Sequence, residues 1–95
     1  MKLESLTHST NPEKKMMAVF RLDNGRTKTT HFGAAGMSDF TIHKDEERKK
    51  RYILRHKVNE NFTDPTTAGA LSRWILWNKP SLRASIADFK HRFSL

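Results

Sequence analysis

The sequence predicts a small α+β domain in which a β-hairpin is followed by three helices, in the order ββααα. Three observations predict it: an Asn-Gly turn between two strand-like runs, a charged segment with acids first and bases last, and two later runs with apolar residues at helical spacing. The chain of 95 residues suffices for one domain with a modest core. We expect this domain to occupy residues 14–95 and the polar, unpatterned residues 1–13 to form a flexible arm.

Residues 14–32 predict the hairpin, because the turn at residues 23–25 separates an apolar run from a threonine-rich return strand. The length of the loop decides the register. A two-residue loop would pair Phe20 with Thr29, whereas a three-residue loop with a bulge would pair Phe20 with Lys28. A shift of one residue exchanges the two faces of a strand, so the sequence leaves open which face meets the core.

The first helix is expected at about residues 43–58, with Thr41 as its N-cap and a narrow apolar face around Ile53 and Leu54. Its acids lie in the first turns and its bases in the last, which suits the helix dipole. A second helix is expected at about residues 66–77. The third begins at Pro80, since proline suits the first helical position, and it carries a one-faced apolar stripe: Leu82, Ile86, Phe89 and Phe93.

The composition bounds the classes of function. The net charge of +8 favours a polyanionic partner. The absence of cysteine excludes disulfides, thiolate metal sites and cysteine nucleophiles, and it favours an intracellular setting for so small a domain. No apolar run approaches the roughly 18 residues of a membrane span, so we expect no membrane partner. We expect no cofactor and no metal site.

The positive charge peaks between residues 48 and 57, which hold six cations and no acid. On a helix, Arg48, Arg51 and Arg55 share one stripe, and the run spans roughly 15 Å, a length that fits successive phosphates. The hairpin adds further cations. The expected nucleic-acid-binding residues are therefore Arg48, Lys49, Lys50, Arg51, Arg55, Lys57, Arg21, Arg26 and Lys28.

The competing interpretation of this run is a solvated helix face. Glu46 would pair with Lys50, and Glu47 with Arg51, at the i, i+4 spacing that stabilises isolated helices. Those two pairs would leave four of the six cations of the run free.

The predicted function is non-enzymatic binding of nucleic acid, DNA in preference to RNA, through phosphate contacts with little sequence preference. No recognition-helix, zinc-finger or RNA-recognition motif is present. One alternative is a minor virion or adaptor protein that binds other proteins, or a homo-oligomer, through apolar surface around Trp74, Trp77 and Phe93.

A second alternative is a metal-dependent nuclease, because a histidine on the second strand of a ββα arrangement resembles nucleases of that type. His31 would activate water, and the metal ligands would be Asp39, His43 or Asp45. These four residues are structural instead if Asp39 or Asp45 caps a helix, which is the interpretation we favour.

Five stretches of the chain carry a resemblance to known sequences, namely residues 31–41, 43–45, 48–53, 55–57 and 67–82. Together they resemble an uncharacterised family of short basic proteins encoded by large DNA viruses of algae and by some algae and protists. No activity is established for that family. The resemblance implies a viral or algal protein that acts inside the infected host cell, and in the virion as a further location.

Overall fold

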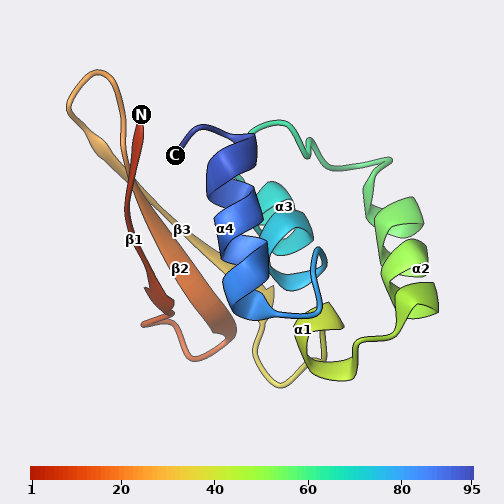
Figure 1. Cartoon of the computed structure of the whole chain (residues 1–95). Coiled ribbons are helices and arrows are strands. Elements are labelled where there is room, and N and C mark those ends of the chain that lie inside the picture. Colours follow the sequence, from red (N-terminus) through yellow and green to blue (C-terminus); the bar gives the residue numbers. More distant parts are fainter.

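A three-stranded antiparallel sheet, in the order β1-β2-β3, is covered on one face by helices in the computed structural model, which describes residues 1–95 (Figure 1). None of the helices has the length and apolar composition that crossing a membrane would require. The elements are β1 (Lys2–His8), β2 (Lys14–Arg21), β3 (Thr27–Ala34), α1 (Phe40–His43), α2 (Glu46–His56), α3 (Ala68–Leu71), the π-helical turn η1 (Ser72–Leu76) and α4 (Leu82–Arg92).

The predicted order ββααα is wrong, first because the segment expected to be a flexible arm contains β1. This strand pairs with β2, with Leu3 opposite Phe20 and Leu6 opposite Ala18. The two leucines are three residues apart, yet both pack against the core, because the register shifts between Leu3 and Ser5. Such a bulge adds one residue and breaks the alternation by which a strand is recognised in a sequence.

The hairpin of β2 and β3 takes the longer of the two loops. Phe20 pairs with Lys28, the Leu22 amide donates to the Arg26 carbonyl at 2.7 Å, and Gly25 has a φ of +84°. A three-residue loop closed by a residue of positive φ is a standard hairpin connection. This register puts Lys28 on the strand face that carries Phe20 and the helices.

The helices are also more numerous than predicted. The segment expected as one helix over residues 43–58 is divided at Lys44, which has a φ of +55°. Asp45 then caps α2 by accepting from the amides of Glu47 and Arg48, at 3.0 and 3.3 Å. Asp39, and not Thr41, caps α1. An aspartate suits both a cap and a first turn, so the sequence alone did not separate the two roles.

The later helices begin after side-chain caps. Thr67 caps α3, which continues into η1, so together they replace the helix expected over residues 66–77. Ser81 caps α4, so this helix begins at Leu82 rather than at Pro80.

The core lies between the sheet and the elements α3, η1 and α4, and α2 stands outside it. Tyr52 is the one buried residue of α2. Leu54, expected on an inward apolar face, is 60% exposed. The core residues are Met16, Ala18, Phe20, Phe32, Leu71, Ile75, Leu76 and Phe89.

Candidate nucleic-acid interface

A short stack of aromatic rings holds α2 against the rest of the molecule. The ring of Tyr52 lies on that of Trp77 with centroids 4.2 Å apart, and His56 stacks on Tyr52 at 4.1 Å. The Lys49 ammonium adds a hydrogen bond of 2.7 Å to the Asn78 carbonyl. Burial, with the nearby Glu60 carboxylate, raises the pKa of Tyr52 to about 12. The helix is therefore attached along one face, and its other residues meet solvent.

The six cations of the basic run divide into three groups. Lys49 is turned inward, where it also lies 4.8 Å from the centre of the Phe40 ring. Lys50 pairs with Glu47 at 3.6 Å, and the pairs predicted for Glu46 with Lys50 and for Glu47 with Arg51 do not form. The remaining four are exposed and have no ion pair; they are Arg48, Arg51, Arg55 and Lys57.

The three cations predicted on the hairpin do not join this group. Arg21 pairs with Glu4 at 2.5 Å, and Lys28 donates to the Thr66 hydroxyl at 3.1 Å. Arg26 is exposed beside the loop that joins β2 and β3, which projects at the opposite side of the molecule from α2 (Figure 1). The nine predicted residues therefore do not form one continuous surface.

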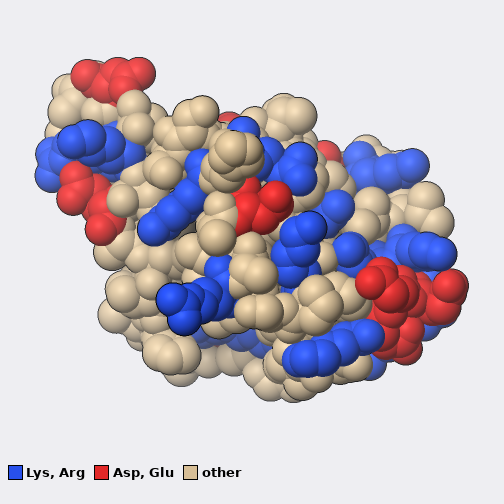
Figure 2. All heavy atoms as spheres, viewed as in Figure 1, with Lys and Arg blue, Asp and Glu red and all other residues tan.

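A second gathering of cations, which sequence reasoning did not select, lies between η1 and α4. The guanidinium groups of Arg73 and Arg92 lie 4.2 and 3.8 Å from the centre of the Trp74 ring. Arg73 also donates to the Trp77 carbonyl at 2.8 Å. Stacking on an indole fixes a guanidinium while leaving most of its donors free. Lys and Arg side chains are prominent on the face that Figure 2 shows.

Arg73 and Arg92 both lie over the Trp74 ring, and Lys49 donates to the carbonyl of Asn78, the residue before Lys79, so these cations are close together. Burial and then the charge of Arg92 lower the pKa of Arg73. Burial lowers the pKa of Lys49, and the charges of Arg73 and Lys79 lower it further against the opposing effect of Glu46. We call Lys49, Arg73, Lys79 and Arg92 the arginine cluster. Its members come from three elements and a loop, so no local run of the sequence reveals it.

Besides Glu46, the acid Asp88 lies within reach of this cluster. Its carboxylate accepts from the Asn78 amide at 2.7 Å and pairs with Arg92 at 3.4 Å. The Asn78 hydrogen bond, then Arg92 and Lys79, lower the pKa of Asp88. Two carboxylates, Asp88 and Glu46, against four cations leave the cluster with an excess of positive charge that an anion would relieve.

The four residues of the nuclease alternative serve local structure. Asp39 caps α1 and pairs with Lys15 at 2.5 Å, and Asp45 caps α2. His43 Nδ1 accepts from the Asp45 amide at 2.9 Å, so neutral His43 carries its proton on Nε2 and has no lone pair left for a metal. His31 Nδ1 lies 2.7 Å from the Ser9 hydroxyl. No three His, Asp or Glu side chains are placed to hold a metal ion.

The aromatic residues of the adaptor alternative are engaged within the molecule. The Trp74 indole donates to the Phe62 carbonyl at 2.8 Å, and Phe93 meets the edge of Trp74 with centroids 6.4 Å apart. Trp77 stacks on Tyr52. Exposed apolar side chains lie instead on α1, α2 and the residues after it, at Ile42, Leu54 and Val58.

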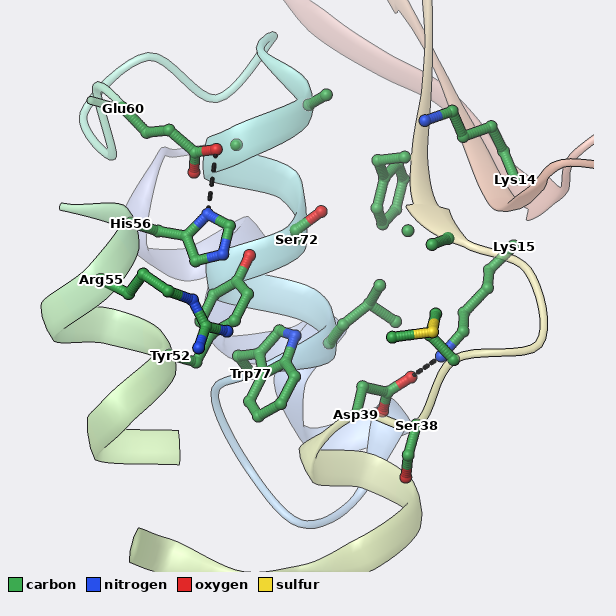
Figure 3. A pocket seen from close by; sticks show the side chains of 17 residues that line it. Lys14, Lys15, Ser38, Asp39, Tyr52, Arg55, His56, Glu60, Ser72 and Trp77 are labelled. Carbon is green, nitrogen blue, oxygen red and sulfur yellow. Dashed lines mark hydrogen bonds and ion pairs between the residues drawn. The ribbon is translucent and has the colours of Figure 1, made fainter. Parts of the chain in front are cut away.

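A groove of about 390 Å³ runs between α2 and the ends of β2 and β3 (Figure 3). Tyr52, Arg55 and His56 of α2 form one wall, and Lys14 and Lys15 of β2 lie across from them. Sequence reasoning did not predict this groove. Its lining comes from segments up to about sixty residues apart in the chain, which only folding brings together.

Comparison with known proteins gives a family and no activity. No curated protein and no solved structure matches the chain. The sequence profile of a family of unknown function, DUF5754, matches residues 4–56, which run from β1 through the last residue of α2. The match spans more than half of the sequence and includes the whole cation-bearing helix. The chain therefore belongs to the family of unknown function DUF5754.

Proposed function

We propose that this protein binds nucleic acid through its phosphates and catalyses no reaction, with α2 as the principal contact. The observation that carries the proposal is that α2 contributes little to the core and many cations to the surface. The helix buries one residue, Tyr52, and exposes four cations that have no acidic partner. Unpaired surface cations add little to stability, so their value lies in what they attract.

The spacing of these cations suits a phosphate backbone. Arg48 and Arg55 are seven residues apart, which is roughly 10 Å along a helix. A duplex strand carries one phosphate per about 3.4 Å of axis, so the stripe faces several phosphates at once. Arg51 lies between the two on the same side of the helix.

The arginine cluster supplies further contacts beside α2. Lys49 joins the two internally, since its ammonium donates to the carbonyl of Asn78, the residue before Lys79, and the contacts come from Arg73, Lys79 and Arg92. Arginine groups held by stacking lose little conformational entropy when they bind a phosphate. The proposed interface therefore extends from the four free cations of α2 across to η1 and α4.

The proposed binding is insensitive to base sequence, because phosphate contacts carry no sequence information. We propose DNA in preference to RNA as the partner, and an infected algal cell or the virion of a large DNA virus as the setting. The viral or algal setting is supported by the resemblance described above, and family membership adds no activity to it.

The test is a titration of a fluorescent 20-base-pair duplex at several salt concentrations. Phosphate contacts by the four free cations of α2 alone predict a slope of log affinity against log salt of about −3.6, and contacts by the arginine cluster would make it steeper. In Arg51→Gln/Arg55→Gln the slope should become shallower by about 2. The control, Lys2→Gln/Arg26→Gln, also removes two positive charges, but at the hairpin end of the sheet, where Lys2 of β1 is the strand neighbour of Arg21 in β2.

This control separates a site from general attraction. The proposal expects the control variant to keep a slope close to that of the native protein. Equal losses in the two variants would mean that net charge alone attracts the duplex. Absence of binding at low salt would refute the proposal altogether.

A protein partner is the alternative, and one observation favours it. Leu54 of α2 and Val58, two residues beyond the end of that helix, are 60% and 72% exposed and offer apolar surface to a partner. If a protein or a second copy of the chain binds there, Leu54→Ser/Val58→Ser should lower the measured mass of the assembly in solution. Under the nucleic-acid proposal the native protein shows no such assembly, and the double variant binds the duplex normally.

A further inference from the structure

The groove beside α2 has ionic features that the phosphate interface does not use. Its two acids are already engaged, since Asp39 pairs with Lys15 at 2.5 Å and Glu60 Oε1 lies 3.2 Å from His56 Nδ1. Two other cations of its lining, Lys14 and Arg55, have no ion pair. An anion that entered the groove would therefore meet two cations without an acidic partner, and the one carboxylate oxygen left without a partner is Glu60 Oε2.

These cations lie on different walls. Figure 3 shows Lys14 on the side of the strands and Arg55 on the side of α2, with Ser72 between them. A phosphate ester placed in the groove can thus meet charge from either wall. Arg55 also belongs to the cation stripe of α2, so the groove opens beside the surface proposed to follow the phosphate backbone.

The rest of the lining suits the organic group that a phosphate ester carries. Met37, which is 64% exposed, and half-buried Trp77 give apolar surface against which a flat ring can lie. Tyr52 and Trp77 are nearly parallel, with an angle of 4° between their planes, so this part of the wall is stiff. Pockets for small organic ligands combine apolar surface with a few placed polar groups and measure about 300–1,000 Å³, and this groove falls in that range.

The groove is also lined by hydrogen-bonding groups. The contact of Glu60 with His56 Nδ1 leaves His56 Nε2 as the free nitrogen of the ring. The Ser72 hydroxyl lines the same groove and can donate or accept. Glu60 Oε2 is buried without a hydrogen-bond partner, so this end of the groove suits a hydrogen-bond donor of the ligand and not its phosphate.

From these features we propose that the groove is a nucleotide-binding site, which takes one phosphate ester with its attached base. The inference rests on the proposed function for its biological source, an unpaired nucleotide of a strand whose backbone lies along α2. The same chemistry would also accept a free mononucleotide. The test distinguishes these two sources.

The first arm compares a blunt 20-base-pair duplex with the same duplex that carries a three-nucleotide single-stranded overhang. The overhang should tighten binding about fivefold in the native protein. Lys14→Gln, which changes the groove alone, should abolish this gain while leaving the affinity for the blunt duplex unchanged. Arg51→Gln, outside the groove, should weaken both duplexes by the same factor and keep the gain.

The second arm titrates the protein with adenosine monophosphate, adenosine and inorganic phosphate, and follows the tryptophan fluorescence. Binding of the monophosphate that is at least tenfold tighter than that of adenosine, and that Lys14→Gln weakens, supports the site. Equal affinities for both duplexes together with no response to the monophosphate would overturn the inference, and the proposed function would stand. If the monophosphate binds and neither duplex does, the nucleotide site stands and the proposed function fails.

Discussion

The rings of Tyr52 and Trp77 lie 4.2 Å apart and almost parallel, and this contact joins the basic helix α2 to the rest of the protein. Tyr52 is the one residue that α2 buries, so the position of the proposed interface depends on this pair. Both residues also line the groove. The stack therefore supports both proposals at once, and it is the first contact to test.

We predict that Trp77→Ala releases α2 without unfolding the sheet. The loss of the stack should lower the free energy of unfolding by about 2–3 kcal/mol, since large-to-small changes of buried aromatics cost about that much or more. Amide hydrogen exchange should show protection lost in α2 and kept in β2 and β3. Leu54→Ala on the same helix is the control and should change stability by less than about 0.5 kcal/mol. A uniform loss of protection along the chain would contradict the prediction.

We predict that the phenol of Tyr52 titrates at a pKa of about 12, above its ordinary value near 10, because burial disfavours the phenolate. It is the one tyrosine of the sequence, so absorbance at 295 nm follows this group alone. The folded state holds the proton more tightly than the unfolded state. The resulting stability is complete below pH 10 and is lost as the pH rises from 10 to 12. In Tyr52→Phe this fall in stability should be absent, while the ring stack remains.

We predict that Gly33→Ala is more damaging than Gly36→Ala. Both glycines have positive φ, +77° and +80°, so both substitutions strain the backbone. A Cβ at Gly33 would also lie 2.6 Å from Leu76 Cδ1, whereas a Cβ at Gly36 would meet nothing within 4 Å. Urea unfolding should show a loss of about 1 kcal/mol for Gly36→Ala and about 2–3 kcal/mol for Gly33→Ala. Equal losses would mean that Leu76 moves aside without cost.

We predict that Asp39→Ala destabilises the protein by about 2–4 kcal/mol, since it removes the cap of α1 and leaves the ammonium of Lys15 without its partner. In the native protein the Thr41 amide donates to Asp39 Oδ1 at 2.9 Å. Asp39→Asn keeps a side-chain oxygen that can accept this bond and loses only the negative charge. Its loss should be about half as large in the same urea titration. If Asn and Ala cost the same, the ion pair with Lys15 and not the cap is what stabilises this junction.

Short-range signals in the sequence predicted the hairpin and the existence of the basic helix. The Asn-Gly turn is a local device, and the structure has its hairpin there, with Gly25 at positive φ. The first strand was missed because its bulge puts Leu3 and Leu6 on one face at a spacing that no regular strand has. The break at Lys44 was missed because Asp45 fits a helical first turn as well as it fits a cap.

The candidate site was predictable only in part. A sequence shows which residues are charged, but not which of them are buried or paired with an acid in the folded protein. Residues 48–57 were identified as a basic run, but their free members depend on which side of α2 faces the molecule. Lys49 was counted as a contact and turns inward to Asn78. Arg73 and Arg92 were not selected, because nineteen residues separate two side chains that meet at Trp74.

The sequence by itself determined an excess of positive charge, the absence of thiol chemistry, the tight turn at Gly25 and a helix that concentrates cations. These properties reside in composition and in neighbours within four residues, so they need no fold to be expressed. The tertiary structure alone decided that Arg48, Arg51, Arg55 and Lys57 stay free, that the arginine cluster forms beside them, and that Lys14 faces Arg55 across a groove. The physical reason is that α2 is oriented by the packing of Tyr52 on Trp77, a contact between residues twenty-five positions apart.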